Sequence, residues 1–406
     1  MIRFLTSGES HGKCLTAIVE GFPSNITITE EYINFHLKRR QQGYGRGLRM
    51  KIESDTVEIL SGVRFGRTMG FPIALKIENK DWKNWTKIMS IDEKDKKGVE
   101  KITIPRPGHA DLNGTLKYNF DDIRNSIERS SARETAARVA ACSIARRFLE
   151  EFNIKVGSFV ESIGGIYPSE SFFKKLVNND YEGNIDAWEI AKKADENETR
   201  TLDPEQHEKI IDKIKIAKKK GDTLGGVFVV IATGAPIGLG SYAHYDRKLS
   251  SDLAASIMSI NAVKGVEIGL GFELANLFGS EAHDEIIIKN NSFSRKTNKS
   301  GGIEGGITTG LPLIIRGAMK PIATLMSPID TIDLKSMSDI EARRERSDFV
   351  AVPACAVIAE SMTAWSLAKF VLEKFGGDSL EETKKNYYNW IIDLNEIQKK
   401  FKDEND

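Results

Sequence analysis

The sequence predicts a single α+β domain in which short strands and tight turns pack against a few long helices. Glycine is frequent (34 residues) and proline is scarce (11). The glycines lie in short clusters between apolar runs, a distribution typical of tight turns within one compact body. Segments 120–152 and 351–375 favour helix, whereas the β-branched run at 226–233 favours a buried strand. No internal repeat or low-complexity tract divides the sequence.

The first eighty residues alternate between expected strands and one helix. Residues 1–20 favour two short strands joined by a glycine-rich turn. Thr29 is a candidate N-cap, followed by two acidic residues, for a helix that ends near Arg40. Strand character returns at 56–63 and 71–78.

The middle of the chain contains a charged stretch and a long helical pattern. Residues 81–100 are highly charged, and we expect an exposed excursion without a functional role. Segment 120–152 is rich in Ala, Arg and Glu and contains neither glycine nor proline, so one unbroken helix is expected there.

The second half is expected to be peripheral and helical at first and then rich in turns. Residues 170–222 favour charged helices, 247–264 favour a helix, and 265–325 favour glycine-rich turns with short strands. We divide the chain into a main domain at 1–375 and a charged, amphipathic C-terminal tail at 376–406.

Composition argues against several classes of protein. Lys and Arg total 58, as do Asp and Glu, so the formal net charge is zero. A nucleic-acid or anionic-membrane partner is therefore not expected, and any anion site must be local. The three cysteines are far apart and none has metal-ligand spacing, so we expect no metal. The N-terminus lacks a signal-peptide pattern and no apolar run is long enough to span a membrane, which favours a cytoplasmic protein.

The first motif with chemical potential is SGESHG at 7–12. Two glycines flank small polar groups and His11, which would let a backbone and an imidazole approach a ligand closely. Histidine titrates near neutral pH and can donate a proton to a leaving oxygen. The alternative is an ordinary turn with a partly exposed histidine.

The second motif, RRQQGYGRGLR at 39–49, sets arginines within a glycine-rich loop. Guanidinium groups bind carboxylates and phosphates bidentately, and glycine lets the loop fold around an anion. A solvated basic loop is the alternative. The segment also resembles RGG-type RNA-binding sequences, although Tyr44 is its one aromatic residue.

Two further motifs carry arginine beside other polar groups. In PRPGHAD at 105–111, two prolines stiffen a loop that presents Arg106 and His109. In RSSARETA at 129–136, Arg129 and Arg133 would share a helix face able to hold a phosphate. An ordinary surface helix with Arg–Glu pairs is the alternative for the second motif.

The last third of the sequence adds glycine pairs and an acid. The segments at 258–265, 301–306 and 320–324 suggest backbone packed against a flat ligand, but none is a P-loop or a GxGxxG fingerprint. In RRERSD at 343–348, Asp348 beside arginines should stay ionised and could accept a proton. Alternatively, Ser347 or Asp348 is the N-cap of the helix that follows. From these residues alone we predict a site for a polyanionic small molecule, without a named reaction.

Taken together and in this order, the motifs resemble the chorismate synthase family. The matching stretches are SGESHG, RRQQGYGRGLRMKIESD, RPGHADL, RSSARETAARVAA, SINAVKGVEIGLGF, GGIEGG, KPIAT and RERSDFVAVPA. They cover nearly the whole chain to about residue 370. The resemblance implies a helical layer sandwiched between two antiparallel β-sheets, assembled as a homotetramer.

The same resemblance implies the reaction, a step of the shikimate pathway to aromatic amino acids. A chorismate synthase is a carbon–oxygen lyase that removes phosphate and a proton from 5-enolpyruvylshikimate 3-phosphate by anti-1,4-elimination. It requires reduced FMN without net redox change, and NADPH is a candidate reductant. The protein would then hold an anionic substrate against a flavin and manage protons.

Residue roles follow from the matched motifs. His11 would protonate or stabilise the departing phosphate, His109 would protonate or neutralise the reduced flavin, and Asp348 would act through flavin N5 in removing the substrate proton. The residues expected to hold the substrate are Ser10, Arg40, Arg46, Arg49, Arg106 and Arg133; of these, Arg40 and Arg46 also match positions associated with NADPH. The residues expected to contact flavin are Arg129, Ser130, Ser131, Asn261, Ala262, Gly305, Lys320, Pro321, Ile322, Ala323, Thr324 and Arg346.

Two competing functions are kept open at this point. A flavin reductase using NAD(P)H is the second enzyme hypothesis, weakened by the lack of a GxGxxG fingerprint. An RNA-binding protein is the non-enzyme hypothesis, and it predicts strong, salt-dependent nucleic-acid binding.

Overall fold

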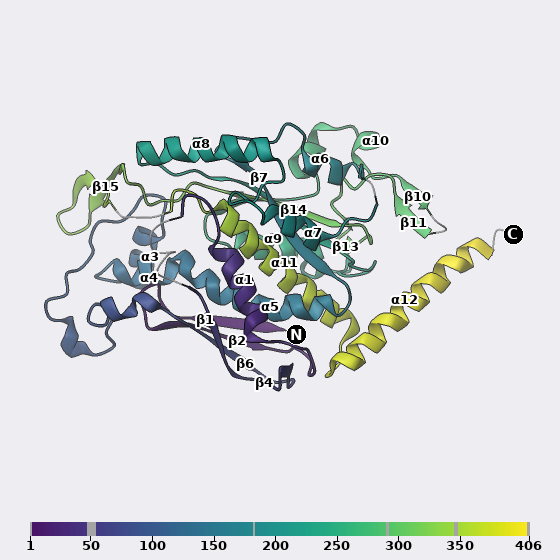
Figure 1. Cartoon of the computed structure of the whole chain (residues 1–406), viewed down its shortest axis with the longest axis horizontal. Helices are drawn as coiled ribbons and strands as arrows, with labels where there is room; N and C mark the ends of the chain where they lie inside the picture. The colour runs from purple at the N-terminus through teal and green to yellow at the C-terminus, as the bar shows by residue number, and fades with distance from the viewer. Residues whose placement is uncertain (1, 47–53, 182, 290–291, 345–347, 404–406) are drawn as a thin grey trace.

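A layer of helices lies between two four-stranded antiparallel sheets (Figure 1). The computed structural model describes residues 2–46, 54–181, 183–289, 292–344 and 348–403. The predicted α+β architecture, with helices sandwiched between sheets, is confirmed by this arrangement.

The first sheet has the strand order β1-β2-β6-β3. Its strands are β1 (Arg3–Ser7), β2 (Cys14–Glu20), β6 (Ile73–Glu78) and β3 (Val57–Ser61). Alternate side chains of β2 and β6 are buried against the helices, as expected for a sheet with one covered face. The loop between β1 and β2 carries the SGESHG motif, so this sheet fixes the position of His11.

The second sheet has the order β7-β8-β14-β9, formed by β7 (Lys155–Ile163), β8 (Gly226–Thr233), β14 (Leu313–Met319) and β9 (Val263–Ile268). Strands β7 and β8 are buried on both faces, and helix α7 (Ala187–Ala194) packs against β7. A Cβ at Gly157 would lie 1.8 Å from the Ala187 carbonyl oxygen, so this close approach requires glycine.

The helical layer consists mainly of α1 (Glu30–Gln41), α5 (Thr135–Glu150), α9 (Leu249–Met258) and α11 (Val352–Phe375). Among the described residues, α11 alone has the length and hydropathy of a membrane-spanning helix. However, 89% of its most apolar window is buried inside the protein, against α5, α9 and both β7 and β8. It is therefore the central core helix.

The remaining elements lie around this sandwich. The helices are α3 (Asp111–Tyr118), α4 (Arg124–Ser130), α6 (Phe172–Val177), α8 (Pro204–Lys220), α10 (Gly279–Ala282) and α12 (Leu380–Asp403). The hairpin strands are β4 (Val63–Arg64) with β5 (Arg67–Thr68), β10 (Ile286–Lys289) with β11 (Ser292–Arg295), β12 (Ile303–Glu304) with β13 (Ile307–Thr308), and β15 (Asp330–Asp333) with β16 (Ser338–Glu341).

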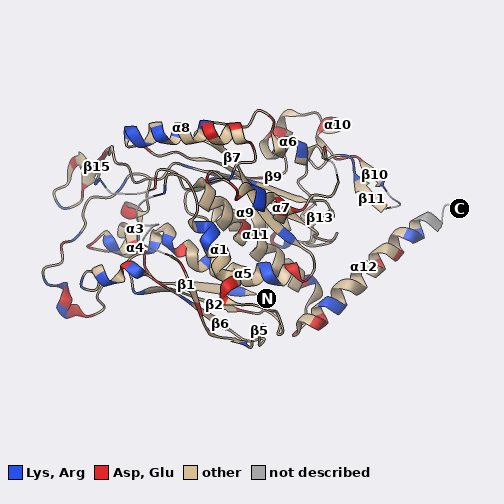
Figure 2. Cartoon of the chain, in the orientation of Figure 1, with Lys and Arg blue, Asp and Glu red and all other residues tan. Residues whose placement is uncertain are grey.

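The C-terminal tail forms α12, which leaves the body of the molecule as a projecting helix (Figure 1). Leu380 and Tyr387 in its first turns are buried, whereas Ile392 and Phe401 are exposed. Basic and acidic residues alternate along α12, whereas in α8 the acidic residues lie towards the N-terminal end and lysines occupy the last turn (Figure 2). The tail is thus helical and charged, as its sequence predicts.

Several local predictions are confirmed because they depend on short-range chemistry. Thr29 is the N-cap of α1, and its Oγ1 accepts a hydrogen bond from the Tyr32 amide at 3.3 Å. The strands predicted at 56–63, 71–78 and 226–233 are present.

Two predicted helices are wrong in extent. The segment 120–152 is interrupted, because Ser131 has an extended backbone (φ −62°, ψ 141°) and its Oγ accepts from the Arg133 amide at the start of a 3₁₀ turn. The predicted helix at 247–264 ends at Met258, because the residues from Val263 onward pair with β14 as strand β9.

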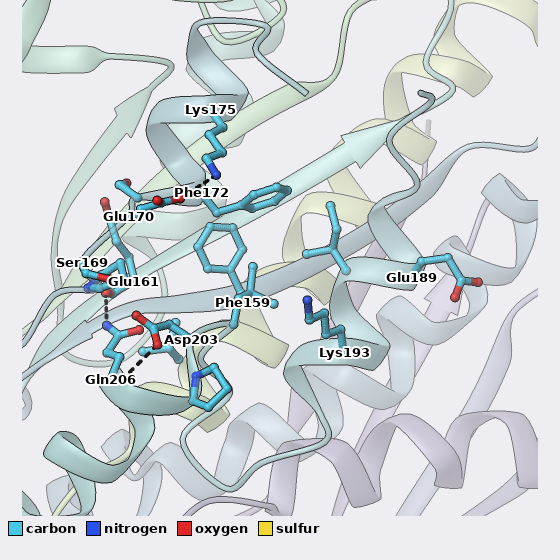
Figure 3. Close-up of a pocket in the computed structure, with 16 residues that line it drawn as sticks. Phe159, Glu161, Ser169, Glu170, Phe172, Lys175, Glu189, Lys193, Asp203 and Gln206 are labelled. Atoms are coloured by element: carbon cyan, nitrogen blue, oxygen red, sulfur yellow. Dashed lines mark hydrogen bonds and ion pairs between the residues drawn. The ribbon is translucent and has the colours of Figure 1, made fainter. Parts of the chain in front are cut away.

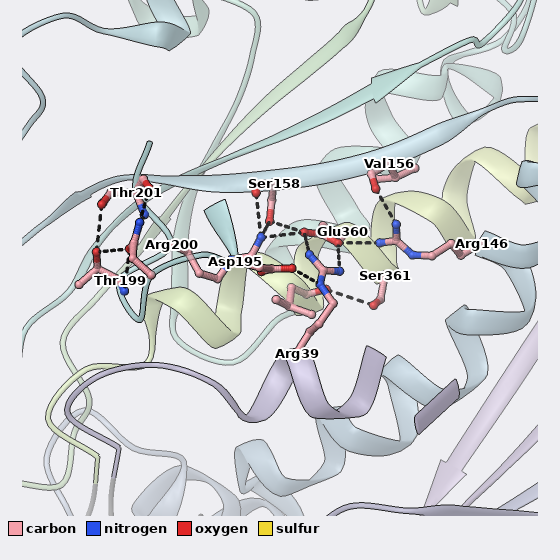
Figure 4. Close-up of polar contacts among 12 residues, drawn as sticks. Arg39, Arg146, Val156, Ser158, Asp195, Thr199, Arg200, Thr201, Glu360 and Ser361 are labelled. Carbon is pink, nitrogen blue, oxygen red and sulfur yellow. Dashed lines mark hydrogen bonds and ion pairs between the residues drawn. The ribbon is translucent and has the colours of Figure 1, made fainter. Parts of the chain in front are cut away.

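A buried carboxylate, Glu360 of α11, binds side chains from four other parts of the fold (Figure 4). Arg39 of α1 donates to both its oxygens at 2.7 and 2.9 Å, and Arg146 of α5 donates at 2.7 Å. Arg200 and the Ser158 hydroxyl of β7 complete the set at 3.1 and 2.7 Å. Burial opposes the charge, but the three guanidinium groups outweigh it and hold the pKa of Glu360 well below its usual range.

We expect Glu360→Gln to lower the free energy of unfolding by about 3–5 kcal/mol, because three buried guanidinium groups would lose their shared anion. Urea unfolding measures this. Ser361→Ala is the matched control, since the Ser361 hydroxyl donates only to the Val357 carbonyl of the same helix. Equal stabilities of the two variants would contradict the importance of Glu360.

The same cluster predicts a pH dependence of stability. The pKa of Glu360 is depressed in the folded protein from an ordinary value of 4.5. Its contribution to stability is therefore fully present above about pH 4.5 and is lost as the pH falls towards the folded-state pKa. Unfolding curves of the parent protein between pH 7 and pH 3 should show this loss, and Glu360→Gln should show a smaller one.

Candidate active site

The candidate site lies at the end of the sandwich where the β1–β2 loop, the end of α1 and helices α3 and α4 come together (Figure 1). Ser10 is buried there, and its amide donates to the Glu128 carbonyl at 3.0 Å. The Ser131 hydroxyl donates to the Ser10 hydroxyl at 3.1 Å. The extended backbone at Ser131 thus brings the SGESHG and RSSARETA motifs into contact.

His11 is anchored by Glu128 of α4. The Glu128 carboxylate accepts from the His11 amide at 2.7 Å and lies 2.9 Å from Nδ1. The indole of Trp85 stacks on the imidazole, with ring centroids 3.9 Å apart. The predicted site residue therefore sits between a buried acid and an aromatic ring.

Arg40 and Arg133 share a single carboxylate, Asp55. Arg133 Nη1 lies 2.5 Å from one Asp55 oxygen and Arg40 Nη1 lies 3.3 Å from the other, and all three side chains are buried. Thr135 Oγ1 and the Ala132 carbonyl accept two further Arg40 hydrogen bonds. Burial lowers the pKa of Arg40 to about 10, so it remains charged at neutral pH. Within this trio two cations face one anion, which favours binding of an additional anion.

Arg46 and Asp348 are brought together, with Arg46 Nε 3.2 Å from a carboxylate oxygen of Asp348. The alternative that Asp348 caps the following helix is wrong, because α11 begins at Val352 and its N-cap is Ala351. Three residues separate Asp348 from the first residue of the helix, so the acid belongs to the loop that faces Arg46. Arg49 and Arg346, together with Ser347, lie outside the described residues.

The RPGHAD loop is organised by Asp111, which is fully buried. One of its oxygens contacts His109 Nδ1 and the other accepts from Arg106 Nε at 2.8 Å. Burial opposes ionisation of Asp111, but the hydrogen bonds from His109 and Arg106 outweigh it and hold the pKa of the carboxyl well below its usual range. An ionised Asp111 requires the proton of neutral His109 to be on Nδ1, which leaves Nε2 for other chemistry. Arg106 Nη1 also donates to Thr324 Oγ1 at 3.2 Å.

A second group of predicted residues surrounds Ser130. Asn261 Nδ2 donates to the Ser130 carbonyl at 3.0 Å, while Asn261 Oδ1 is buried without a hydrogen-bond partner in the described structure. Ala262 has a left-handed backbone (φ 66°), and its carbonyl accepts from the Lys320 amide at 2.9 Å. The Lys320 ammonium contacts the Gly108 carbonyl and so joins this group to the RPGHAD loop.

Contacts of Pro321, Ile322 and Ala323 hold the rest of the KPIAT segment (320–324) in position. The Ile322 carbonyl accepts from the Thr223 hydroxyl at 2.8 Å. A Cβ at Gly108 would lie 3.8 Å from Ala323, so these two loops touch. Pro321 follows Lys320 where the backbone packs against Gly225.

Two predicted placements differ in the structure. Arg129 and Arg133 do not share a helix face, because Ser131 breaks the helix between them. Arg129 instead donates to the carbonyls of Thr6 and Gly8 at 2.9 and 3.1 Å. It therefore holds the end of β1 in place.

Gly305 is also set apart. It lies in the β12–β13 hairpin turn with φ 59°, and a Cβ there would approach only Tyr242, at 4.0 Å. No described contact joins it to the other predicted residues.

The sequence interpretation overlooked four residues of the site: Asp55, Trp85, Asp111 and Glu128. Asp55 and Asp111 are acids within the matched stretches RRQQGYGRGLRMKIESD and RPGHADL. Their occurrence in motifs that also contain arginine could have identified them as partners of those arginines. Trp85 lies in the charged excursion and no sequence feature connects it to His11. Glu128 becomes relevant only once α4 packs beside the β1–β2 loop.

Two cavities differ in their relation to this site. One of about 520 Å³ adjoins it and includes Arg124, which lies 3.4 Å from Glu128, together with Arg343 and Lys87. Another of about 600 Å³ lies on the outer side of the second sheet, between Phe159, Phe172 and Gln206 (Figure 3). No predicted site residue lines this outer cavity.

These features define an enzyme that acts on an anionic small molecule: buried arginines outnumber their acids, and two histidines are oriented by carboxylates. A family model described as chorismate synthase matches residues 2–372. The chain therefore belongs to the chorismate synthase family.

Individual relatives agree with this assignment. The chorismate synthase of Chloroherpeton thalassium is 55% identical over 387 residues, covering 95% of this chain and 97% of the relative. That of Aquifex aeolicus is 51% identical over 392 residues, covering 96% and 97%. A crystal structure of chorismate synthase superposes with a TM-score of 0.79 at 44% identity, covering 97% of this chain and 98% of the other. The expected class, a carbon–oxygen lyase that forms chorismate in the shikimate pathway, is confirmed.

The shared carboxylate of Asp55 leads to a test of the anion site. We expect Asp55→Asn to lower the free energy of unfolding by about 3 kcal/mol, because Arg40 and Arg133 would lose their common partner. Added phosphate should restore part of that loss by replacing the missing negative charge. Urea unfolding with and without phosphate measures both effects. Asp203→Asn, at the N-cap of α8, is the control and should show neither.

Proposed function

We propose that this chain forms chorismate with reduced FMN as its flavin, using His11, His109 and Asp348 as proton-handling groups. The observation that carries the proposal is the Arg40–Asp55–Arg133 trio beside Ser10, which combines excess positive charge with a hydroxyl pair. Such a site suits a substrate that carries a phosphate and carboxylates.

The residues around Ser130 fit a flavin. Asn261 Oδ1 is a buried acceptor without a partner, and a flavin ring N–H is a donor that could satisfy it. The left-handed backbone at Ala262 and at Gly108 (φ 75°) opens main-chain atoms to a flat ligand. Reduced flavin would supply electron density that helps the phosphate depart.

The protein's own groups would then manage charge and protons. Arg40, Arg46, Arg106 and Arg133 would hold the substrate's anionic groups, and His11 would neutralise the departing phosphate. His109 would take up and release a proton at Nε2, because Asp111 keeps the other ring proton on Nδ1. We propose that the remaining residues predicted from the motifs hold the substrate or contact the flavin, as the resemblance implies.

The carboxylate of Asp348 would accept the proton lost from the substrate. Arg46 Nε lies 3.2 Å from this carboxylate and holds it in the loop that faces the other arginines. In this elimination, the substrate loses one phosphate and one proton, and no other group is transferred.

An anaerobic assay with FMN, dithionite and 5-enolpyruvylshikimate 3-phosphate tests the reaction. We expect chorismate to form only when flavin is reduced. Its formation with oxidised flavin, or no product although substrate and flavin bind, would contradict the proposal. Turnover in air with NADPH as the sole reductant would add a flavin reductase activity.

We expect His109→Ala to reduce kcat about a hundredfold, because a positioned proton-transfer group contributes on that scale. His244→Ala is the matched control, since His244 contacts Asp246 in a similar His–Asp pair on the surface. Circular dichroism of both variants checks the fold. Parent-level turnover by His109→Ala would remove His109 from the mechanism.

We also propose a homotetramer in the cytoplasm, with residues 1–375 as the catalytic domain and 376–406 as an added tail. NADPH is proposed as the reductant, with Arg40 and Arg46 near it. Light scattering should give about four times the 45.2 kDa chain mass. A monomer at micromolar concentration would contradict the tetramer.

A further inference from the structure

Trp85, from the charged excursion, is built into the surroundings of His11. The planes of the two rings are inclined by 29°, so they are stacked and not merely adjacent. Trp85 Nε1 donates to Asp81 at 2.8 Å, which fixes the indole, and the Arg124 guanidinium lies 5.1 Å from the ring centroid. The excursion therefore places an aromatic ring against His11, a predicted catalytic residue.

The base of the excursion is tied to the loop that carries His11. The buried Asn79 side chain donates to the carbonyls of Glu9 and Gly12 at 3.1 and 2.7 Å. Its oxygen accepts from Arg133 Nε at 2.9 Å. The position of Trp85 is thus coupled to both the His11 loop and the anion site.

Glu128 determines the proton arrangement on His11. Its carboxylate is buried, and burial alone would favour the neutral form. The hydrogen bonds from the His11 ring and amide outweigh burial and lower the pKa of Glu128. An ionised carboxylate only accepts hydrogen bonds, so His11 Nδ1 must carry a proton.

We propose that Glu128 and Trp85 are positioning residues for His11: Glu128 keeps the proton on Nδ1, Trp85 covers one ring face, and Nε2 is left as the nitrogen that exchanges a proton with substrate. This inference rests on the proposed role of His11. The charged groups that contact this pair are Glu128 and Arg124 from α4 and Asp81, which binds the Trp85 indole; the Glu9 side chain of the same loop lies beside Gly12.

Replacing the acid by its amide tests the tautomer. In Glu128→Gln, an NH₂ group would replace one of the two oxygens that accept hydrogen bonds from His11, so two donors would face each other. The negative charge would also be lost. We expect kcat to fall at least about tenfold with a smaller change in KM. Glu134→Gln is the matched control: Glu134 is also a buried acid, but it contacts Thr6 and Arg138.

Trp85 provides a readout that is independent of turnover. A protonated imidazole stacked on an indole quenches its fluorescence more than a neutral one. The difference in emission between the parent and Trp85→Phe should therefore change with pH. We expect His11→Gln to abolish this change and Glu128→Gln to alter it, because the Glu128 carboxylate holds the imidazole against the indole.

The outcomes separate this inference from the proposed function. Parent-like kcat together with parent-like Trp85 emission in Glu128→Gln would overturn the inference while leaving chorismate formation intact. A pH-independent Trp85 emission in the parent would overturn the stacking. Full activity of His11→Gln would instead remove His11 from the proposed mechanism, whatever the fluorescence shows.

Discussion

The structure depends on one buried carboxylate that neutralises several arginines at once. Glu360 lies in the middle of α11 and receives hydrogen bonds from α1, α5, β7 and the loop that contains Arg200 (Figure 4). Asp195 assists by pairing with Arg39 at 2.6 Å and with Arg200 at 2.8 Å. Apolar packing alone would tolerate small rotations of these helices, whereas a bidentate ion pair fixes their relative orientation.

The Arg40–Asp55–Arg133 anion site is connected to this core through helix α1. Arg39 and Arg40 are consecutive in α1, yet they serve different networks: Arg39 contacts Glu360, and Arg40 contacts Asp55 and Thr135. Because Glu360 lies in α11 and Thr135 begins α5, Arg39 joins α1 to α11 and Arg40 joins α1 to α5. The arginines that we propose to bind substrate are thus tied to helices of the central layer, which suits a site that must hold charge in a defined place.

The sequence predicts the features that depend on local chemistry, as the Thr29 cap and the strands of both sheets show. The break at Ser131 was not predictable from propensity, since the surrounding residues all favour helix. Ser131 becomes extended where its hydroxyl meets Ser10, and the Ala132 carbonyl in the turn that follows accepts from Arg40. Motif resemblance identified His11, but it could not identify the ring stacked on it, because Trp85 lies in a charged stretch without periodicity.

The Glu360 cluster also has a consequence for biosynthesis. Arg39 and Glu360 are separated by 321 positions, and Arg146 and Glu360 by 214. A nascent chain emerging from the ribosome would contain all three arginines long before α11 is made. Until then, the cationic side chains cannot be buried without their counterion, so the sandwich cannot close around them. The N-terminal sheet and its helices should therefore remain open during translation and close only when the last core helix arrives.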